Sequence, residues 1–141
     1  TVVQRSHDLQ RLSARSNRER PGQDMGRLTT HVLDLTRGLP AAGMTLELAS
    51  LAGATRSTVK KVATNHDGRC DAPLLEGDAF TPGEWQLEFH VGDYFAARGA
   101  VLDNPRFLNI VVIRFGIANP AQHLHVPLLV TPWGYSTYRG S

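Results

Sequence analysis

HLHVPLLVTPWGYSTYRGS, residues 123–141, is the stretch that decides the fold. It is typical of two β-strands joined by a turn at Thr131-Pro132. Because side chains alternate along a strand, His123 and His125 share one face of the first strand, and the apolar residues between and after them share the other. The hairpin therefore separates polar groups from a hydrophobic core.

The same pattern of short strands extends back to Leu28, with Gly, Pro, Asn and Asp between the strands, as in an all-β sandwich. Strands are expected at residues 28–36, 44–52, 57–64, 84–91, 107–118, 123–130 and 133–138, with a weaker one near Leu74. One short helix is expected at residues 93–98, with Asp93 as its N-cap and Gly99 as its stop.

Composition indicates one globular domain, since 41% of the 141 residues are apolar and 20% are charged. No apolar run approaches the length of a membrane span, and the first residues lack the apolar core of a secretory signal. Cys70 is the only cysteine, which excludes an intrachain disulfide. We therefore expect no membrane partner and a cytoplasmic location, with periplasm and peroxisome left open.

The positive charge is concentrated at the start of the chain. Residues 1–27 hold six arginines against three acidic residues, whereas the remainder holds nine basic and ten acidic residues. The domain itself is therefore not basic, and no nucleic-acid partner is expected. Residues 1–26 lack an apolar period and are predicted to be a disordered leader or linker before a domain at 27–141. The leader would be explained by a remnant of cloning, by a start site placed upstream of Met25, or by a linker that is left from a larger polypeptide.

Residues 107–115 are apolar on nearly every position, so the strand expected there needs cover on both faces. The second sheet would cover one face of this strand. A partner subunit would cover the other, which predicts an oligomer.

Three motifs together are similar to those of the 5-hydroxyisourate hydrolases, the transthyretin-related enzymes of urate breakdown. They are TTHVLD at 29–34, DGR at 67–69 and HVPLL followed by the terminal YSTYRGS. The resemblance covers residues 27–141 and implies a transthyretin-like sandwich of two four-stranded sheets with one short helix. It also implies a homotetramer, a dimer of dimers with active sites in a central channel. In some relatives the hydrolase is fused to a ureidoimidazoline decarboxylase, so a fusion partner is a further expectation.

Taken alone, the candidate site residues have ordinary structural interpretations. A strand histidine such as His31 is more often structural than catalytic, and Arg69 follows a tight Asp67-Gly68 turn at which arginine is common. Pro127 marks an irregular position two residues after His125, where side chains are often re-aimed. The resemblance implies that His31, Arg69 and His125 are the catalytic residues.

The terminal tetrapeptide would ordinarily be frayed. The resemblance implies instead that it folds into the mouth of the pocket and binds substrate through Tyr138, Arg139, Gly140 and Ser141.

The resemblance further implies hydrolysis of 5-hydroxyisourate to 2-oxo-4-hydroxy-4-carboxy-5-ureidoimidazoline, without cofactor or metal. Either His125 or His31 would activate water, and Arg69 would hold the substrate carbonyls. The main alternative is a transthyretin-like carrier of a small ligand. Two weaker alternatives are a zinc site at His31, His123 and His125, which lacks a nearby carboxylate or thiol, and an immunoglobulin-like module, which lacks the cysteine pair.

Overall fold

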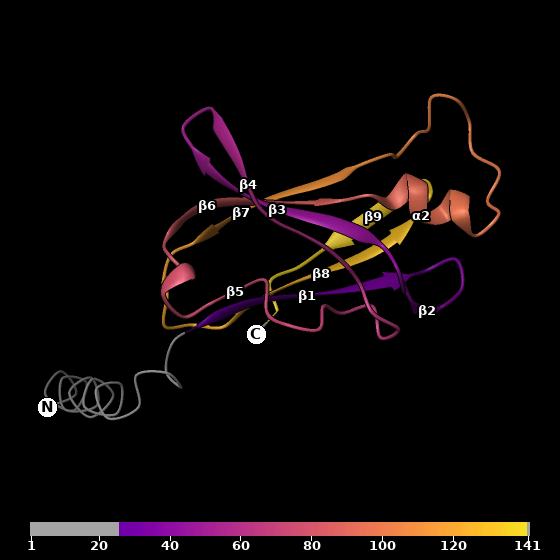
Figure 1. Cartoon of the computed structure of the whole chain (residues 1–141). Helices are drawn as coiled ribbons and strands as arrows, with labels where there is room; N and C mark the ends of the chain where they lie inside the picture. Colours follow the sequence, from indigo (N-terminus) through magenta and orange to yellow (C-terminus); the bar gives the residue numbers. More distant parts are fainter. Residues whose placement is uncertain (1–25, 141) are drawn as a thin grey trace, which may run out of the picture.

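The computed structural model describes residues 26–140, which form two stacked β-sheets (Figure 1). One sheet contains β1 Arg27–Asp34, β2 Leu39–Pro40, β5 Leu75–Glu76, β8 Leu124–Thr131 and β9 Gly134–Thr137. The other contains β3 Thr45–Ala52, β4 Thr55–Ala63, β6 Gly83–Phe89 and β7 Val111–Ile117. The 3-10 turn η1 spans Gly77–Ala79, and the helix α2 spans Val91–Ala97. The expected all-β sandwich with one short helix is confirmed.

The first sheet has five strands where four were expected, because two very short segments share one edge of β1. β8 runs parallel to β1 on one side. On the other side β5 pairs with the start of β1 and β2 pairs with its end. β5 lies where the weak strand near Leu74 was expected. Residues 1–25 of the predicted leader lie outside the described residues, and its last residue, Gly26, is buried just before β1. No described helix is long and apolar enough to cross a membrane.

The apolar run at 107–115 differs from the expectation. β7 begins only at Val111, and Phe107 lies before it with 73% of its surface exposed. Within β7, Val111 and Ile113 are buried while Val112 is 46% exposed. The strand therefore has a covered face and an open face in the single chain, as expected of a strand in a two-layered sandwich.

The helix also begins earlier than expected. Its N-cap residue is His90, so the prediction of Asp93 as N-cap is wrong. The Asp93 carboxylate instead accepts a 2.7 Å hydrogen bond from Arg106. The predicted stop is confirmed, because Gly99 follows the helix with a φ of 85°, which favours glycine.

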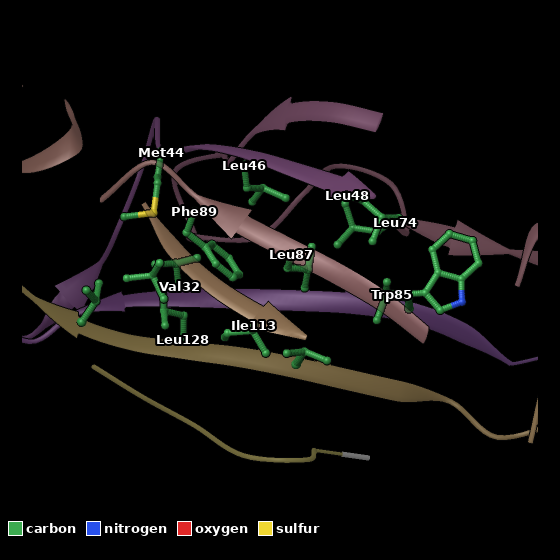
Figure 2. Packing of buried hydrophobic residues seen from close by; sticks show 14 of the residues in the cluster. Val32, Met44, Leu46, Leu48, Leu74, Trp85, Leu87, Phe89, Ile113 and Leu128 are labelled. Atoms are coloured by element: carbon green, nitrogen blue, oxygen red, sulfur yellow. The ribbon is translucent and has the colours of Figure 1, made fainter. Parts of the chain in front are cut away.

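The core lies between the sheets and is filled by aliphatic and aromatic side chains (Figure 2). Strand alternation decides which residues enter it: in β1, Leu28 and Val32 are fully buried, while Thr29 and His31 face outward. Asp34 is also buried, at 1% exposure, and accepts hydrogen bonds from Tyr94 Oη at 2.9 Å and from Thr36. This carboxylate ties the end of β1 to α2.

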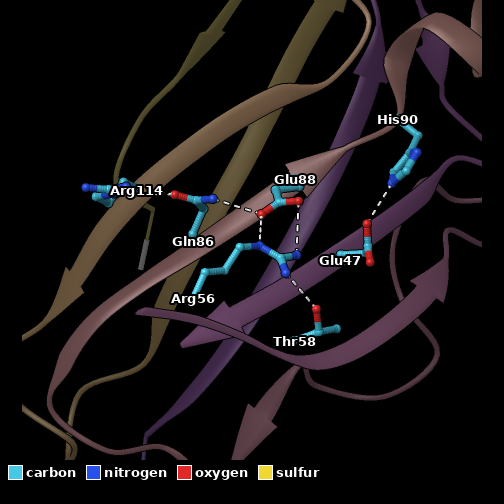
Figure 3. Close-up of polar contacts among 7 residues, drawn as sticks. All are labelled: Glu47, Arg56, Thr58, Gln86, Glu88, His90 and Arg114. Atoms are coloured by element: carbon cyan, nitrogen blue, oxygen red, sulfur yellow. Dashed lines mark hydrogen bonds and ion pairs between the residues drawn. The ribbon is translucent and has the colours of Figure 1, made fainter. Parts of the chain in front are cut away.

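The outer face of the four-stranded sheet carries a charged network (Figure 3). Arg56 contacts Glu88 through two hydrogen bonds of 2.5 and 3.1 Å, and His90 lies 3.0 Å from Glu47. An ion pair such as Arg56–Glu88 is typical of a solvated surface. The expected site residues lie on the outer face of the other sheet.

Candidate functional site

Two adjacent parallel strands bring the histidines together. In the register of β1 and β8, Thr29 lies opposite His125, and His31 lies opposite Pro127. Because neighbouring residues in register point to the same face, Thr29, His31 and His125 share the outer face of the sheet. His123 comes just before β8 and faces the same side, since its ring lies within 3.3 Å of the Thr29 hydroxyl oxygen.

Arg69 reaches the same place from a different part of the chain, through the expected tight turn. The Asn65 side-chain oxygen accepts hydrogen bonds from the backbone N–H groups of Asp67 and Arg69 at 2.9 and 3.2 Å. Gly68 has a φ of 73°, and a Cβ there would lie 2.4 Å from the carbonyl oxygen of Val32. Only glycine therefore fits, and the turn closes against β1.

This contact with β1 fixes the position of Arg69. The Val32 N–H donates to the Gly68 carbonyl at 2.8 Å, and His31 forms an isolated antiparallel bridge with Arg69. The arginine is thus placed beside His31 by backbone hydrogen bonding.

A cleft of about 370 Å³ lies over this part of the sheet, a size that suits a small molecule. Its walls are formed by Arg27, Thr29, Thr30, Arg69, Cys70, Ala72, His123 and His125. Two of the three predicted catalytic residues, Arg69 and His125, line the cleft directly. His31 lies beside both but is not part of the wall.

Gly140 joins the tail of the chain to His125. The Gly140 N–H donates to the His125 carbonyl at 2.8 Å, and the His125 N–H donates back at 3.3 Å. Pro127 has no N–H to give to the tail, and its carbonyl accepts instead from the Thr137 hydroxyl at 2.7 Å. A Cβ on Gly140 would lie 2.9 Å from Cδ2 of His125. The tail is therefore packed against the imidazole.

The other predicted tail residues are placed differently. Tyr138 is 61% exposed, and the Arg139 guanidinium lies 3.4 Å from the Gln122 side-chain oxygen, beside a separate pocket of about 70 Å³. Within residues 26–140, no hydrogen bond joins Tyr138 or Arg139 to the histidines. The prediction for Ser141 lies outside the described residues.

Burial and nearby arginines favour neutral imidazoles. Burial lowers the pKa of His125, and the charges of Arg69, His31 and His123 lower it further. The backbone of Thr29 has the opposite effect and raises this pKa. Burial and then Arg69 lower the pKa of His31, against the opposing effect of Asp67. Burial and then Arg27 lower the pKa of His123. At neutral pH these side chains can therefore accept a proton.

Two residues of this site were missed from the sequence. Thr29 bonds to two histidines, and Arg27 lines the cleft and acts on His123. The period of two along β1 contained the signal for Thr29, because it precedes His31 by two residues and shares its face. Arg27 had no such signal, since it is the first residue of the predicted domain and directly follows the predicted leader.

A zinc site was considered for His31, His123 and His125. In the described part of the chain, no group of three or more His, Cys, Asp or Glu side chains is arranged to hold a metal ion. The imidazole of His125 is instead bonded to a hydroxyl through Nδ1.

Comparison with known proteins gives a consistent result. Residues 28–140 match the model of the HIUase/Transthyretin family. A "5-hydroxyisourate hydrolase" of Ralstonia nicotianae is 55% identical over 117 residues, covering 83% of this chain and all of that protein.

Two solved structures are also similar. The Klebsiella pneumoniae 5-hydroxyisourate hydrolase has a TM-score of 0.67 and 33% identity, covering 82% of this chain and 94% of that one. An (S)-allantoin synthase has a TM-score of 0.79 and 44% identity, covering 85% of this chain but only 45% of that one.

Proposed function

Because the chain belongs to the HIUase/transthyretin family and hydrolyses 5-hydroxyisourate, we propose that His31, Arg69 and His125 carry out this reaction. The observation that supports these roles best is the convergence of Arg69 and His125 on one cleft, with His31 bridged to Arg69. A fixed positive charge and a neutral imidazole at one site suit attack of water on a carbonyl.

In the proposed mechanism, His125 is the base. Its neutral ring takes a proton from water as the water oxygen bonds to the lactam carbonyl carbon, and the C–N bond of the ring then breaks. The leaving nitrogen receives the proton. His125 is chosen over His31 because it lines the cleft, whereas His31 is not among the residues that form its wall.

Arg69 stabilises the negative charge that develops on the carbonyl oxygen. Its guanidinium stays charged throughout, and its backbone is fixed against β1. We assign an orienting role to His31 from its position, because its backbone bridges Arg69 and its side chain shares the outer face of the sheet with His125.

Single alanine replacements test these roles. Substrate generated freshly is followed by its ultraviolet absorbance, and His31→Ala, Arg69→Ala and His125→Ala should each lower kcat by about 10²-fold or more. His66→Ala is the matched control, since the side chain of His66 is 88% exposed in the same turn as Arg69. Near-normal turnover in any of the three would remove that residue from the mechanism.

We also propose that the protein is a homotetramer. In the described chain, β7 and β9 are the last strands of their sheets, and all four residues of β9 are exposed. Such edges pair readily with another copy. Analytical ultracentrifugation should give a mass about four times that of the 15.5 kDa chain. A 15.5 kDa particle at micromolar concentration would contradict the tetramer.

A fusion is the remaining proposal. It is supported by the similar (S)-allantoin synthase, of which this chain covers 45%. We propose that the hydrolase unit belongs to such a longer polypeptide. The intact mass of the natural protein tests this, and a mass near 15.5 kDa would contradict it.

A further inference from the structure

Thr29 connects two of the histidines around the cleft. Its hydroxyl oxygen lies 2.8 Å from Nδ1 of His125 and 3.3 Å from Nε2 of His123. Among residues 26–140, neither ring has another side-chain partner, and Nδ1 of His123 is buried without one. The Thr29 hydroxyl is therefore the side-chain hydrogen-bond partner that the two rings share.

A hydroxyl carries a single hydrogen, so it cannot donate to both rings. If it donates to His123, then Nδ1 of His125 must carry a hydrogen and donate to Thr29. The lone pair of His125 then lies at Nε2. In the second arrangement the Thr29 hydroxyl donates to Nδ1 of His125, so the ring hydrogen of His125 lies at Nε2. Only the first arrangement lets His125 take a proton from water at Nε2.

The first arrangement is the one that the proposed base requires, because it leaves the lone pair of His125 at Nε2. The geometry allows it, since the Thr29 hydroxyl oxygen lies within hydrogen-bond distance of both rings, at 2.8 and 3.3 Å.

We propose that Thr29 is a positioning residue: its hydroxyl accepts from Nδ1 of His125 and donates to Nε2 of His123, which leaves Nε2 of His125 free to accept a proton. This inference rests on the proposed role of His125 as base. It gives Thr29 the task of choosing the tautomer, because the hydrogen bond at one ring nitrogen decides which nitrogen holds the proton.

Two substitutions at Thr29 separate the hydroxyl from the shape of the side chain. Thr29→Val keeps the β-branched shape that suits a strand but removes the hydroxyl, whereas Thr29→Ser keeps the hydroxyl. In metal sites, loss of the group that orients a ligating histidine typically costs about 10- to 100-fold, and we expect a loss of the same order for the oriented base here. Thr29→Val should therefore lower kcat by about that factor with less change in KM, and Thr29→Ser should stay within about threefold of the parent.

Thr131→Val is the control for loss of a hydroxyl elsewhere on the same sheet. Thr131 lies at the far end of β8, where its hydroxyl oxygen bonds only within the hairpin turn. Its kcat should match that of the parent protein.

The tautomer is read directly by nitrogen-15 NMR of the full chain with labelled histidines. The parent and Thr29→Ser should show the His125 hydrogen at Nδ1, and Thr29→Val should show it moving to Nε2. A hydrogen at Nε2 in the parent, or full turnover with Thr29→Val, would overturn the proposal. A parent protein that did not accelerate the decay of 5-hydroxyisourate would instead contradict the function itself.

Discussion

Replacing Gly140 by alanine should damage the site while leaving the fold intact. A Cβ at this position would lie 2.9 Å from Cδ2, 3.0 Å from Cβ and 3.3 Å from Cγ of His125. Carbon atoms in ordinary contact are about 3.5–4.0 Å apart, so the imidazole must move by roughly 0.5–1 Å. The hydrogen bond to Thr29 on Nδ1 opposes that movement.

The size of the effect follows from this displacement. Misplacing a reacting group by about 1 Å typically lowers the rate by about 10²-fold. We therefore expect kcat to fall by about that factor in Gly140→Ala. The free energy of unfolding should change by less than about 1 kcal/mol, because Gly140 lies in a short tail outside the core.

The assay is the decay of freshly generated 5-hydroxyisourate, measured beside a urea unfolding curve. Gly134→Ala is the matched control, because the nearest atom to a Cβ at Gly134 is the Thr131 hydroxyl oxygen at 3.9 Å. This variant should keep its turnover. Full turnover in Gly140→Ala would refute the reasoning, and so would equal losses in both variants.

Three further predictions concern pH, the core and the tail. The pKa values of His31, His123 and His125 are lowered, so the acid limb of kcat/KM against pH should lie below about 6.5, the ordinary histidine value. Below about pH 6.5 the unfolded chain binds more protons at these histidines than the folded protein does. The free energy of unfolding that they contribute is therefore present above about pH 6.5 and is lost as the pH falls through the pKa values of the folded protein. A rise in the free energy of unfolding on acidification would contradict this. Tyr94→Phe removes a partner of the buried Asp34 carboxylate and should cost about 1–3 kcal/mol in urea unfolding, with turnover retained at low temperature. A tag appended after Ser141 should lower kcat, since Gly140 pairs with His125, whereas a tag before Thr1 should leave kcat unchanged. Equal activity of the two tagged proteins would show that the tail takes no part in the reaction.

The strands were predictable from the sequence where burial alternates. Leu124, Val126 and Leu128 enter the core and the histidines face away, as the period of two requires. Residues 107–110 were misassigned because an apolar run does not by itself distinguish a strand from a loop. The short strand β2 was not predicted because its two residues are too few for a periodic pattern. β5, also of two residues, was expected only as a weak strand near Leu74.

The site was predictable only in part. Motifs predicted His31, Arg69 and His125, but the meeting of the two histidines depends on the parallel register of β1 and β8, which joins residues nearly a hundred positions apart. The direction of Arg139, toward Gln122, depends on tertiary contacts and had no local signal. The close approach of Gly140 to an imidazole likewise required the folded structure.

The turn that carries Arg69 also covers part of an edge of β1. One edge of β1 faces away from β8, and three separate segments close it: β5 at the start, Gly68 and Arg69 in the middle, and β2 at the end. An open edge of a strand is a template for pairing with other chains. Substitutions that distort the turn would therefore remove the arginine and expose the edge together, so inactive variants of Gly68 should also be the insoluble ones.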